Sequence, residues 1–260
     1  MFSEEQRCLY HNHQLVQVIC QLRFPEILTI GANAPVDFQE AIRGEFPVYQ
    51  ARQETPAPKL TGAPGNFQVM NQAPTVNYQF MTQDGVWKVN LTSKFISLST
   101  TRYTGWEDFA RMLDKPLAKF ISVYHPAYFE RVGLRYINVI SRKALDLEEP
   151  FRELIHSRYL GVLADEQVAE QNATKCSVDA EFVIRGGCRA KIHAGPGMVK
   201  KQNVQDPEIK FIFDQDLFMP GNVPVNLSAG ALQTLHGQAF SIFRDAITDK
   251  LHDAMDPRTI

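Results

Sequence analysis

The sequence predicts an α+β protein in which antiparallel sheets carry long helices. Three patterns support this class: apolar residues alternate over stretches of strand length, glycine turns separate such stretches, and two long stripes of apolar residues have helical spacing. Strands followed by a long helix occur twice along the chain. We therefore expect two architecturally related halves, residues 1–143 and 144–260, closely packed against each other.

The first half is predicted to contain a strand, a short helix, an exposed loop, a three-stranded meander, a long helix and a closing strand. These elements cover residues 15–24, 35–47, 55–65, 76–99, 104–121 and 131–141. Asp84-Gly85 has the composition of a hairpin turn. Thr104 and Glu107 have the spacing of a capping box, and Pro116 is expected to bend the helix or to end it early.

The second half is predicted to contain a helix, a hairpin, a further strand, a connection rich in proline and glycine, and a long terminal helix. The helix covers residues 150–159, the hairpin strands 178–184 and 188–192, the third strand 209–213 and the connection 219–225. Gly186-Gly187 marks the hairpin turn. Ser228 is predicted to cap the terminal helix, whose apolar stripe extends to Leu251.

Composition limits the classes of protein that are compatible with this chain. Of the 260 residues, 44% are hydrophobic and 22% charged, which is enough to bury a core without disulfides or metals. The four cysteines lack CxxC spacing, and the start resembles no export signal, so we expect a cytoplasmic protein that does not contact membranes. The formal charge of -2 is dispersed, which argues against nucleic acid as a partner.

Three segments of the first half suggest a relationship. The residues Leu22-Arg-Phe-Pro25, the stretch from Ser97 to Phe109, and Gly133-Leu-Arg-Tyr-Ile-Asn138 resemble an uncharacterised, sporadically distributed bacterial protein family of about this length. The resemblance implies a bacterial cytosolic protein from a family with no assigned activity. Its patchy distribution is typical of accessory genes, such as defence, mobile-element or toxin-associated modules. It supplies no catalytic residues.

The strand around Gly133 contains the most interesting candidates for ligand binding. On a strand, Arg131, Gly133 and Arg135 share one face, while Tyr136 and Asn138 share the other. Two arginines beside a glycine can hold a carboxylate or phosphate, with the glycine giving the ligand close access. The commoner explanation is a structural pair between an arginine and a carboxylate, with Asn138 in a turn at the strand end.

A second candidate is the stretch from His193 to Lys201, which contains Gly195 and Gly197 and ends in Lys200 and Lys201. Backbone amides of a glycine-containing loop can cradle an anion, with the lysines behind it. The spacing is not that of a P-loop, so a plain hairpin connection is the favoured interpretation.

Two further groups of residues have the chemistry of metal ligands. Cys8, His11 and His13 have zinc-ligand chemistry but lie near a terminus that is expected to fray. Asp214 and Asp216 resemble metal-binding carboxylates, although surface turn acids are the commoner case. No GxSxG or signature cysteine occurs. We therefore predict no catalytic residue, no metal and no cofactor.

Histidine and aromatic side chains have simpler explanations. His236 shares a helix face with Phe240 and is expected to be a packed histidine. Tyr78, Phe80 and Trp87 can in principle stack nucleic-acid bases, but their place on the apolar face favours core packing.

These observations favour a non-catalytic binding or assembly subunit of a bacterial accessory system, associated with defence or mobile elements. Its predicted partner is another protein encoded nearby, with a homo-oligomer as an alternative. A second hypothesis is a sensor of a small anionic ligand, with a cavity between sheet and terminal helix. Its ligand-binding residues are Arg131, Arg135, Tyr136, Asn138, Lys200 and Lys201. A third is a metal-dependent hydrolase or nuclease that uses Asp214 and Asp216.

Overall fold

The computed structural model describes residues 2–55, 59–63, 66–70, 74–201 and 204–259. Most strands of this described part belong to one antiparallel sheet: β2 (Leu15–Arg23), β3 (Val48–Glu54), β6 (Thr75–Met81), β7 (Trp87–Leu91), β8 (Phe95–Thr100), β9 (Phe129–Ile140), β10 (Val178–Val183), β11 (Arg189–Lys201) and β12 (Val204–Val223). Their order across the sheet is β10-β11-β12-β9-β2-β8-β7-β6-β3. Two small sheets pair β1 (Cys8–Tyr10) with β13 (Pro257–Thr259) and β4 (Lys59–Ala63) with β5 (Asn66–Met70).

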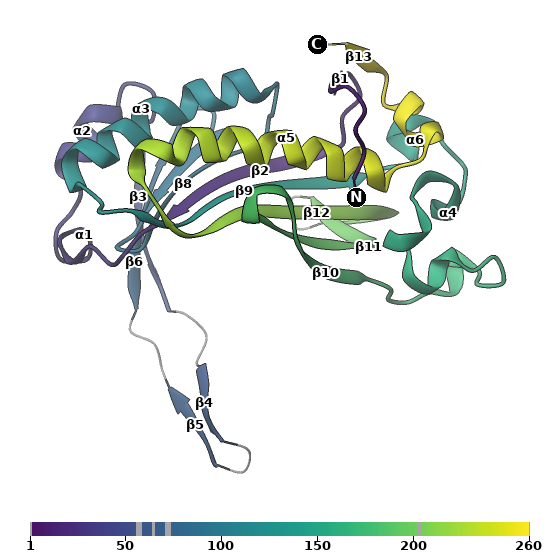
Figure 1. The fold of residues 1–260 in the computed structure, drawn as a ribbon, viewed down its shortest axis with the longest axis horizontal. Coiled ribbons are helices and arrows are strands. Elements are labelled where there is room, and N and C mark those ends of the chain that lie inside the picture. Colours follow the sequence, from purple (N-terminus) through teal and green to yellow (C-terminus); the bar gives the residue numbers. More distant parts are fainter. Residues whose placement is uncertain (1, 56–58, 64–65, 71–73, 202–203, 260) are drawn as a thin grey trace.

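Two long helices, α3 (Trp106–Tyr124) and α5 (Ser228–Ala246), lie side by side on one face of the large sheet (Figure 1). Four shorter α-helices are α1 (Leu28–Ala32), α2 (Val36–Ile42), α4 (Phe151–Leu154) and α6 (Asp249–Ala254). Single turns of 3-10 helix occur at η1 (Lys143–Leu145), η2 (Ser157–Tyr159), η3 (Gly161–Ala164), η4 (Glu170–Asn172), η5 (Arg185–Gly187) and η6 (Val225–Leu227). The predicted α+β class, with antiparallel sheets and helices packed on them, is confirmed.

Strands from both predicted halves join the same sheet. Antiparallel pairing of β12 with β9 extends from Phe211 opposite Ile140 to Val223 opposite Phe129, and β9 in turn pairs with β2. The strands of residues 1–143 and 144–260 therefore share one continuous hydrogen-bonded layer. The division into two related halves stays a prediction.

The core lies between this sheet and the two long helices. On β2, the side chains of Val18, Cys20 and Leu22 are completely buried, as the two-residue period of the strand predicts. The rings of Phe24 and Phe120 are 4.7 Å apart, which joins the end of β2 to α3. Full burial of each such side chain contributes about 1.5–3 kcal/mol to the free energy of folding.

Both predicted hairpin turns are confirmed. Gly85 connects β6 to β7 with a φ of 69°, and Gly186 and Gly187 connect β10 to β11 with φ values of 74° and 73°. These values lie in the left-handed region that glycine enters without a steric penalty.

Three segments that were predicted as loops are strands. Their proline and glycine content indicated loops, but each segment pairs with a neighbouring strand. Residues 59–63 of the predicted loop 55–65 form β4, and 56–58 and 64–65 lie outside the described residues. The predicted loop from His193 to Lys201 is part of β11, and the predicted connection 219–225 is strand as far as Val223. The two long strands pair with each other from Arg189 opposite Phe218 to Lys201 opposite Val204.

The glycines of β11 serve packing. A Cβ on Gly195 would lie 2.3 Å from the carbonyl oxygen of Cys176, and one on Gly197 would lie 2.6 Å from Cδ1 of Ile212. The contact at Gly195 is with backbone and leaves no room for a larger residue, whereas a larger residue at Gly197 would require the end of the Ile212 side chain to shift.

A single bridge explains two helix ends that the sequence prediction placed wrongly. Ile155 pairs with Ile247 as an isolated antiparallel bridge. The helix predicted over 150–159 therefore ends at Leu154, and the terminal helix ends at Ala246 before α6 begins. The apolar periodicity predicted that both helices continue through these positions, but the backbone at the bridge is extended and ends them.

The predicted features of helix starts also differ. The residue before α3 is Gly105 and no side chain caps the helix, so the capping box of Thr104 and Glu107 does not form; the Thr104 hydroxyl instead donates to Asp108 Oδ2 at 2.6 Å. Ser228 is the first residue of α5, and its hydroxyl donates to the carbonyl oxygen of Val225 at 2.8 Å. Pro116 lies inside α3, which continues to Tyr124.

The amino-terminal segment is held in place, which corrects the expectation that it frays. Its strand β1 pairs with β13, with Cys8 opposite Thr259 and Tyr10 opposite Pro257. Within the described residues, no helix combines the length and the apolar character needed to cross a membrane.

Candidate functional site

The two arginines of the candidate anion site are paired with the two aspartates that the metal-dependent alternative would use. Nη2 of Arg131 donates to Asp216 Oδ1 at 2.6 Å. Arg135 donates to both carboxylate oxygens of Asp214, with Nε 2.7 Å from Oδ1 and Nη2 on Oδ2. The structural ion pair, which was the commoner explanation for these arginines, is what the fold contains. Because both carboxylates are held by arginines, the geometry gives no support to the metal-dependent hydrolase.

Gly133 has a different role from the one predicted. A Cβ at this position would lie 2.1 Å from Nη1 of Arg131, so the glycine makes room for the arginine side chain instead of a ligand. The same guanidinium group lies 4.5 Å from the centre of the Phe218 ring, at the distance of a cation–π contact. The guanidinium group of Arg131 is therefore held by Asp216, by the Phe218 ring and by its close fit over Gly133.

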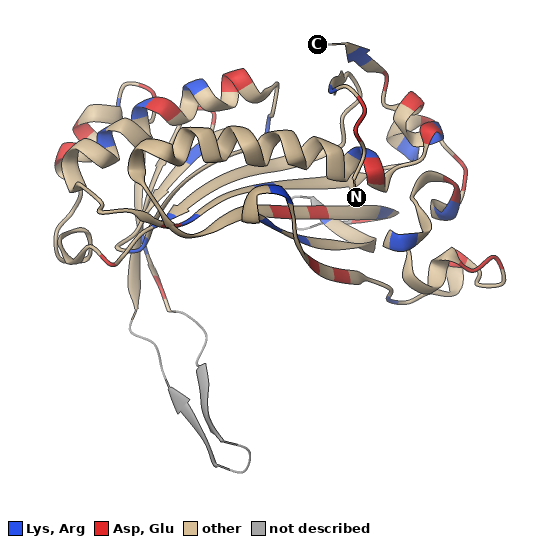
Figure 2. Ribbon diagram, viewed as in Figure 1, with Lys and Arg blue, Asp and Glu red and all other residues tan. Residues whose placement is uncertain are grey.

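Further charge pairs continue across the neighbouring strands, and we call this whole set the charged sheet face. It comprises Arg131, Arg135, Asp179, Glu181, Arg189, Lys191, His193, Asp214 and Asp216. Arg189 and Lys191 on β11 approach Glu181 on β10 at 3.1 and 3.5 Å, and His193 approaches Asp179 at 2.7 Å. Figure 2 shows the acidic bands on β10 and β12. The set lies on the face of the sheet opposite α3 and α5.

A hollow of about 420 Å³ lies on this face. Among its lining residues are four cations, Arg23, Arg131, Arg135 and Lys191, and one carboxylate, Asp216. The side chain of Arg23 makes no hydrogen bond or ion pair with any described residue. The hollow therefore has an excess of positive charge and one cation that is not already paired.

The six predicted ligand-binding residues lie in three different places. Arg131 and Arg135 belong to the charged sheet face, whereas Tyr136 and Asn138 lie on the other face, beneath α5. Lys200 and Lys201 lie at the far end of β11, opposite Gln205 and Val204. The alternation of faces along β9 is as predicted, but these positions on the strands do not come together in one place.

On the sheet-facing side of α5, His236 contacts residues from the amino-terminal segment, α3 and β9. Its Nε2 accepts a hydrogen bond from Nη2 of Arg7, and its Nδ1 lies 2.8 Å from the hydroxyl of Tyr136. The Trp106 ring stacks on the imidazole at 4.5 Å with an interplanar angle of 9°. Burial, together with the nearby Arg7, lowers the pKa of His236 to about 3. His236 is a packed histidine, as expected.

The hydrogen bonds around His236 have a defined direction. Arginine can only donate, so Nε2 carries no proton, and in the neutral ring Nδ1 donates to the Tyr136 oxygen. The Tyr136 hydroxyl then donates to Tyr103, whose pKa is raised to about 12, chiefly by burial. Burial also raises the pKa of Tyr136. The side chains of His236, Tyr136 and Tyr103 are therefore all uncharged at neutral pH.

A cavity of about 140 Å³ adjoins this network, between the sheet, α5 and the amino-terminal segment. Sequence reasoning missed two of its lining residues, Gln215 and Arg7. A signal for Gln215 exists in the sequence, because it is a polar residue at an inward position between Phe213 and Leu217. Arg7 has no such signal, since its contact with His236 joins residues more than 200 positions apart.

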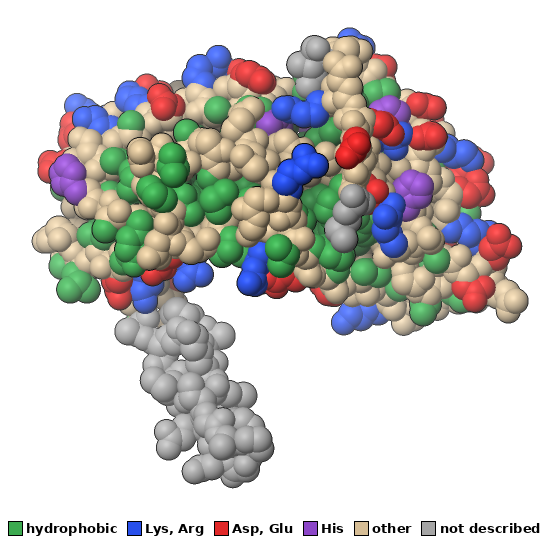
Figure 3. All heavy atoms as spheres, viewed as in Figure 1, with side chains coloured by type: hydrophobic (Ala, Val, Ile, Leu, Met, Phe, Trp, Pro, Cys, Tyr) green, Lys and Arg blue, Asp and Glu red, His purple; other side chains and the backbone are tan. Residues whose placement is uncertain are grey.

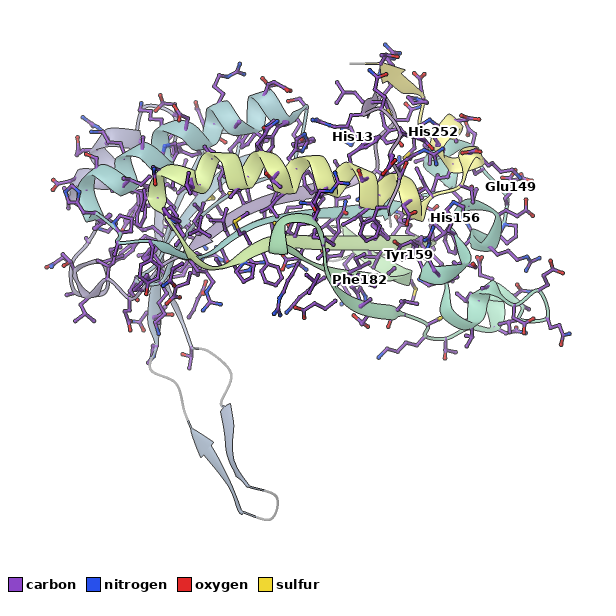
Figure 4. The ribbon with its side chains drawn as sticks, in the orientation of Figure 1. His13, Glu149, His156, Tyr159, Phe182 and His252 are labelled. Carbon is purple, nitrogen blue, oxygen red and sulfur yellow. The ribbon has the colours of Figure 1, made fainter. Side chains whose placement is uncertain are left out.

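The zinc-ligand candidates do not converge. Cys8 belongs to β1, and His11 and His13 follow it in the turn toward β2. Figure 4 shows His13 and, on α6, His252, whose Nδ1 lies 2.8 Å from the Tyr10 hydroxyl. Among the described residues, no group of three or more His, Cys, Asp or Glu lies close enough to hold a metal ion.

The aromatic residues considered for base stacking belong to the core. Tyr78 and Phe80 are buried, and Trp87 packs against Phe109 with ring centres 5.7 Å apart. Core packing was the favoured interpretation of these residues.

Comparison with known proteins gives no relative: no protein-family model and no curated protein sequence matches this chain. The fold and the sites alone define the class of protein, an α+β protein with helices on one face of its large sheet and charge pairs on the other.

Proposed function

We propose that this protein is a non-catalytic binding or assembly subunit that recognises another protein through the charged sheet face. The observation that carries this proposal is the alternation of exposed cations and anions on neighbouring strands. The side chains of Lys191, Glu181 and His193 are 56%, 41% and 49% exposed, so they are accessible to a partner. Because they stand on paired strands, their positions are preorganised for binding.

The alternation of charge favours a protein as the partner. A nucleic acid requires clustered cations to neutralise phosphates, whereas each basic residue of the charged sheet face has a carboxylate beside it. Basic side chains also stand beside acidic ones on the surface seen in Figure 3. Interleaved charges of both signs suit a partner with a complementary pattern and set the register of the complex.

The resemblance to a sporadically distributed bacterial family supports the biological setting. It suggests a cytoplasmic protein of an accessory system, associated with defence or mobile elements, whose partner is the product of a neighbouring gene.

The test is co-expression with the products of the neighbouring genes, followed by size-exclusion chromatography with light scattering. We expect one product to co-elute with the wild-type chain and to be lost in Lys191→Glu, which reverses a charge in the middle of the charged sheet face. Lys119→Glu makes the same charge reversal at another exposed lysine, on α3, and is the matched control that should keep the complex. A complex that survives Lys191→Glu, or a chain that co-elutes only with itself, contradicts the proposal.

A second candidate function is a sensor of a small anion, favoured by the hollow lined by Arg23, Arg131, Arg135 and Lys191. A ligand present at 100 times its dissociation constant adds about 2.7 kcal/mol to the free energy of unfolding. Screening phosphates and carboxylates by thermal unfolding should therefore reveal it. The shift should disappear in Arg23→Gln, which removes the cation that has no described partner. Persistence of the shift in Arg23→Gln would exclude this hollow.

A further inference from the structure

The cavity between the sheet, α5 and the amino-terminal segment is bordered by two side chains of opposite charge. Arg7 belongs to the amino-terminal segment and Glu107 to the first turn of α3, and both line the cavity. Arg7 donates to His236, whose ring is neutral, and the Glu107 carboxylate accepts no hydrogen bond from a described residue. Neither charge has an ion-pair partner among the described residues. The cavity therefore has a cation and an anion that the described part of the fold does not neutralise.

Tyr103, which also lines the cavity, lies near both charges. Its pKa is raised chiefly by burial, and the nearby Arg7 lowers this pKa while the nearby Glu107 raises it. Arg7 and Glu107 therefore lie around the same hydroxyl group, yet they are too far apart to pair with each other. A molecule that occupies the space between them meets both a guanidinium group and a carboxylate.

Most of the remaining cavity surface is apolar. Leu15 on β2, Phe240 and Phe243 on α5, and Met255 after α6 contribute to it. Phe243 and Met255 are buried, so this part of the cavity lies inside the protein. The volume of about 140 Å³ is close to that of an engineered cavity, in another protein, of about 150 Å³ that binds benzene. A branched aliphatic group or a phenyl group therefore fits.

The charged lining groups are more accessible to solvent than the apolar ones. Glu107 is exposed and Arg7 is half-buried, whereas Phe243 and Met255 are buried. A charged group bound beside Glu107 and Arg7 keeps part of its hydration, so the large penalty for burying an isolated charge does not arise. An apolar group bound beside Phe243 and Met255 leaves water, which is favourable. The cavity therefore suits a molecule with a charged end and an apolar end.

We propose that this cavity binds a free α-amino acid with an apolar side chain, whose carboxylate accepts from Arg7 and whose ammonium group donates to Glu107. An α-amino acid carries both charges on neighbouring atoms and its apolar group as a third branch, which matches the three kinds of lining group. Arginine has five N–H donors, so Arg7 can hold a carboxylate while one donor remains on His236. The site is separate from the charged sheet face and does not depend on the protein-binding function.

The test uses leucine and phenylalanine, each with two analogues: the acid that lacks the amino group and the amine that lacks the carboxylate. Binding is followed by NMR of ¹³C-labelled methionine methyl groups, because Met255 lines the cavity and Met112 on α3 does not. In the wild-type chain we expect at least one of the two amino acids to shift the Met255 signal and to leave that of Met112 unchanged. Both of its analogues should bind about tenfold more weakly, which corresponds to the loss of one charge-assisted hydrogen bond.

Two variants assign the charges of the ligand to their partners. Glu107→Gln should weaken binding of the amino acid about tenfold and leave binding of the acid analogue unchanged. Arg7→Gln, whose amide can still donate to His236, should weaken the amino acid by a similar factor and leave the amine analogue unchanged. Asp114→Asn is the control, because Asp114 is exposed on α3 and does not line the cavity, and it should change none of these affinities.

Two results with the wild-type chain would overturn the proposal. One is a Met255 signal that neither amino acid moves at any concentration. The other is an acid or amine analogue that binds as tightly as its amino acid, because one of the two charges would then have no role. Because both results come from the unaltered chain, the proposal remains testable if a variant does not fold.

Discussion

The guanidinium group of Arg131 occupies the space that the Cβ atom of any other residue would need at Gly133. An ideal Cβ on Gly133 would be 2.1 Å from Nη1 of Arg131. The backbone at position 133 cannot move aside, because it pairs with Phe218 on β12 and with Gln21 on β2. A larger residue must therefore displace the arginine.

The first prediction follows for Gly133→Ala. The arginine loses its ion pair with Asp216 and its contact with Phe218, and we expect the free energy of unfolding to fall by about 1–2 kcal/mol. Urea unfolding measures this change. Gly230→Ala on α5 is the control, because no atom lies within 4 Å of the added Cβ, and alanine in a helix should leave stability unchanged or raise it. Equal stability of Gly133→Ala and the wild type would show that Arg131 is not held as described.

Gly195→Ala should have a larger effect than Gly133→Ala. Its Cβ would lie 2.3 Å from the backbone oxygen of Cys176, and a backbone segment moves less readily than the end of an arginine side chain. We expect a loss of about 3 kcal/mol in the same urea experiment. If the two alanine variants were equally stable, the close approach of the Cys176 segment to β11 would be wrong.

The sequence was sufficient to predict which residues of β9 share a face. Alternation is a local property of a strand, so Arg131 and Arg135 could be separated from Tyr136 and Asn138 without a structure. Their partners could not be predicted. Asp214 meets Arg135 only through the register of β12 against β9, and that register depends on pairing between segments about 80 residues apart.

Element lengths were the least predictable feature, for a related reason. Gly195 and Gly197 read locally as a loop, yet tertiary packing places both in the middle of β11. The apolar stripe of the last helix extends past Ile247, but the bridge to Ile155 ends that helix. In each case a contact with a distant segment outweighs the local preference. The cavity was equally hidden, since its residues come from both ends of the chain and from the middle.

A third prediction concerns Arg135→Ala. Asp214 then loses both of its hydrogen bonds to Arg135, and in the wild-type structure only 14% of its side chain is exposed, so water replaces these bonds incompletely. We expect the free energy of unfolding to fall by about 1–3 kcal/mol. Arg111→Ala removes an exposed pair with Asp108, whose arginine is 75% exposed, and should cost about 0.5 kcal/mol or less. Equal losses in the two variants would mean that the Arg135 pair is no more than a surface contact.

The last prediction uses the buried imidazole of His236. Burial lowers its pKa from 6.5 to about 3. As the pH falls through 6.5, the unfolded chain takes up a proton at this residue, whereas the folded chain does not until about pH 3. The stability that the neutral ring provides is complete above pH 6.5 and is lost as the pH falls toward 3. In this window the free energy of unfolding decreases by up to about 1.4 kcal/mol per pH unit from this group alone.

Urea unfolding of the wild type and of His236→Gln at several pH values between 7 and 4 tests this dependence, with His11→Gln as the control at an exposed histidine. The other titrating groups are the same in all three proteins, so the difference in slope belongs to the replaced histidine. We expect His236→Gln to lose less stability than the wild type as the pH falls, even if it is less stable at neutral pH. Parallel curves for the wild type and His236→Gln would mean that the imidazole takes up a proton in the folded protein, and Arg7 could then not donate to its Nε2.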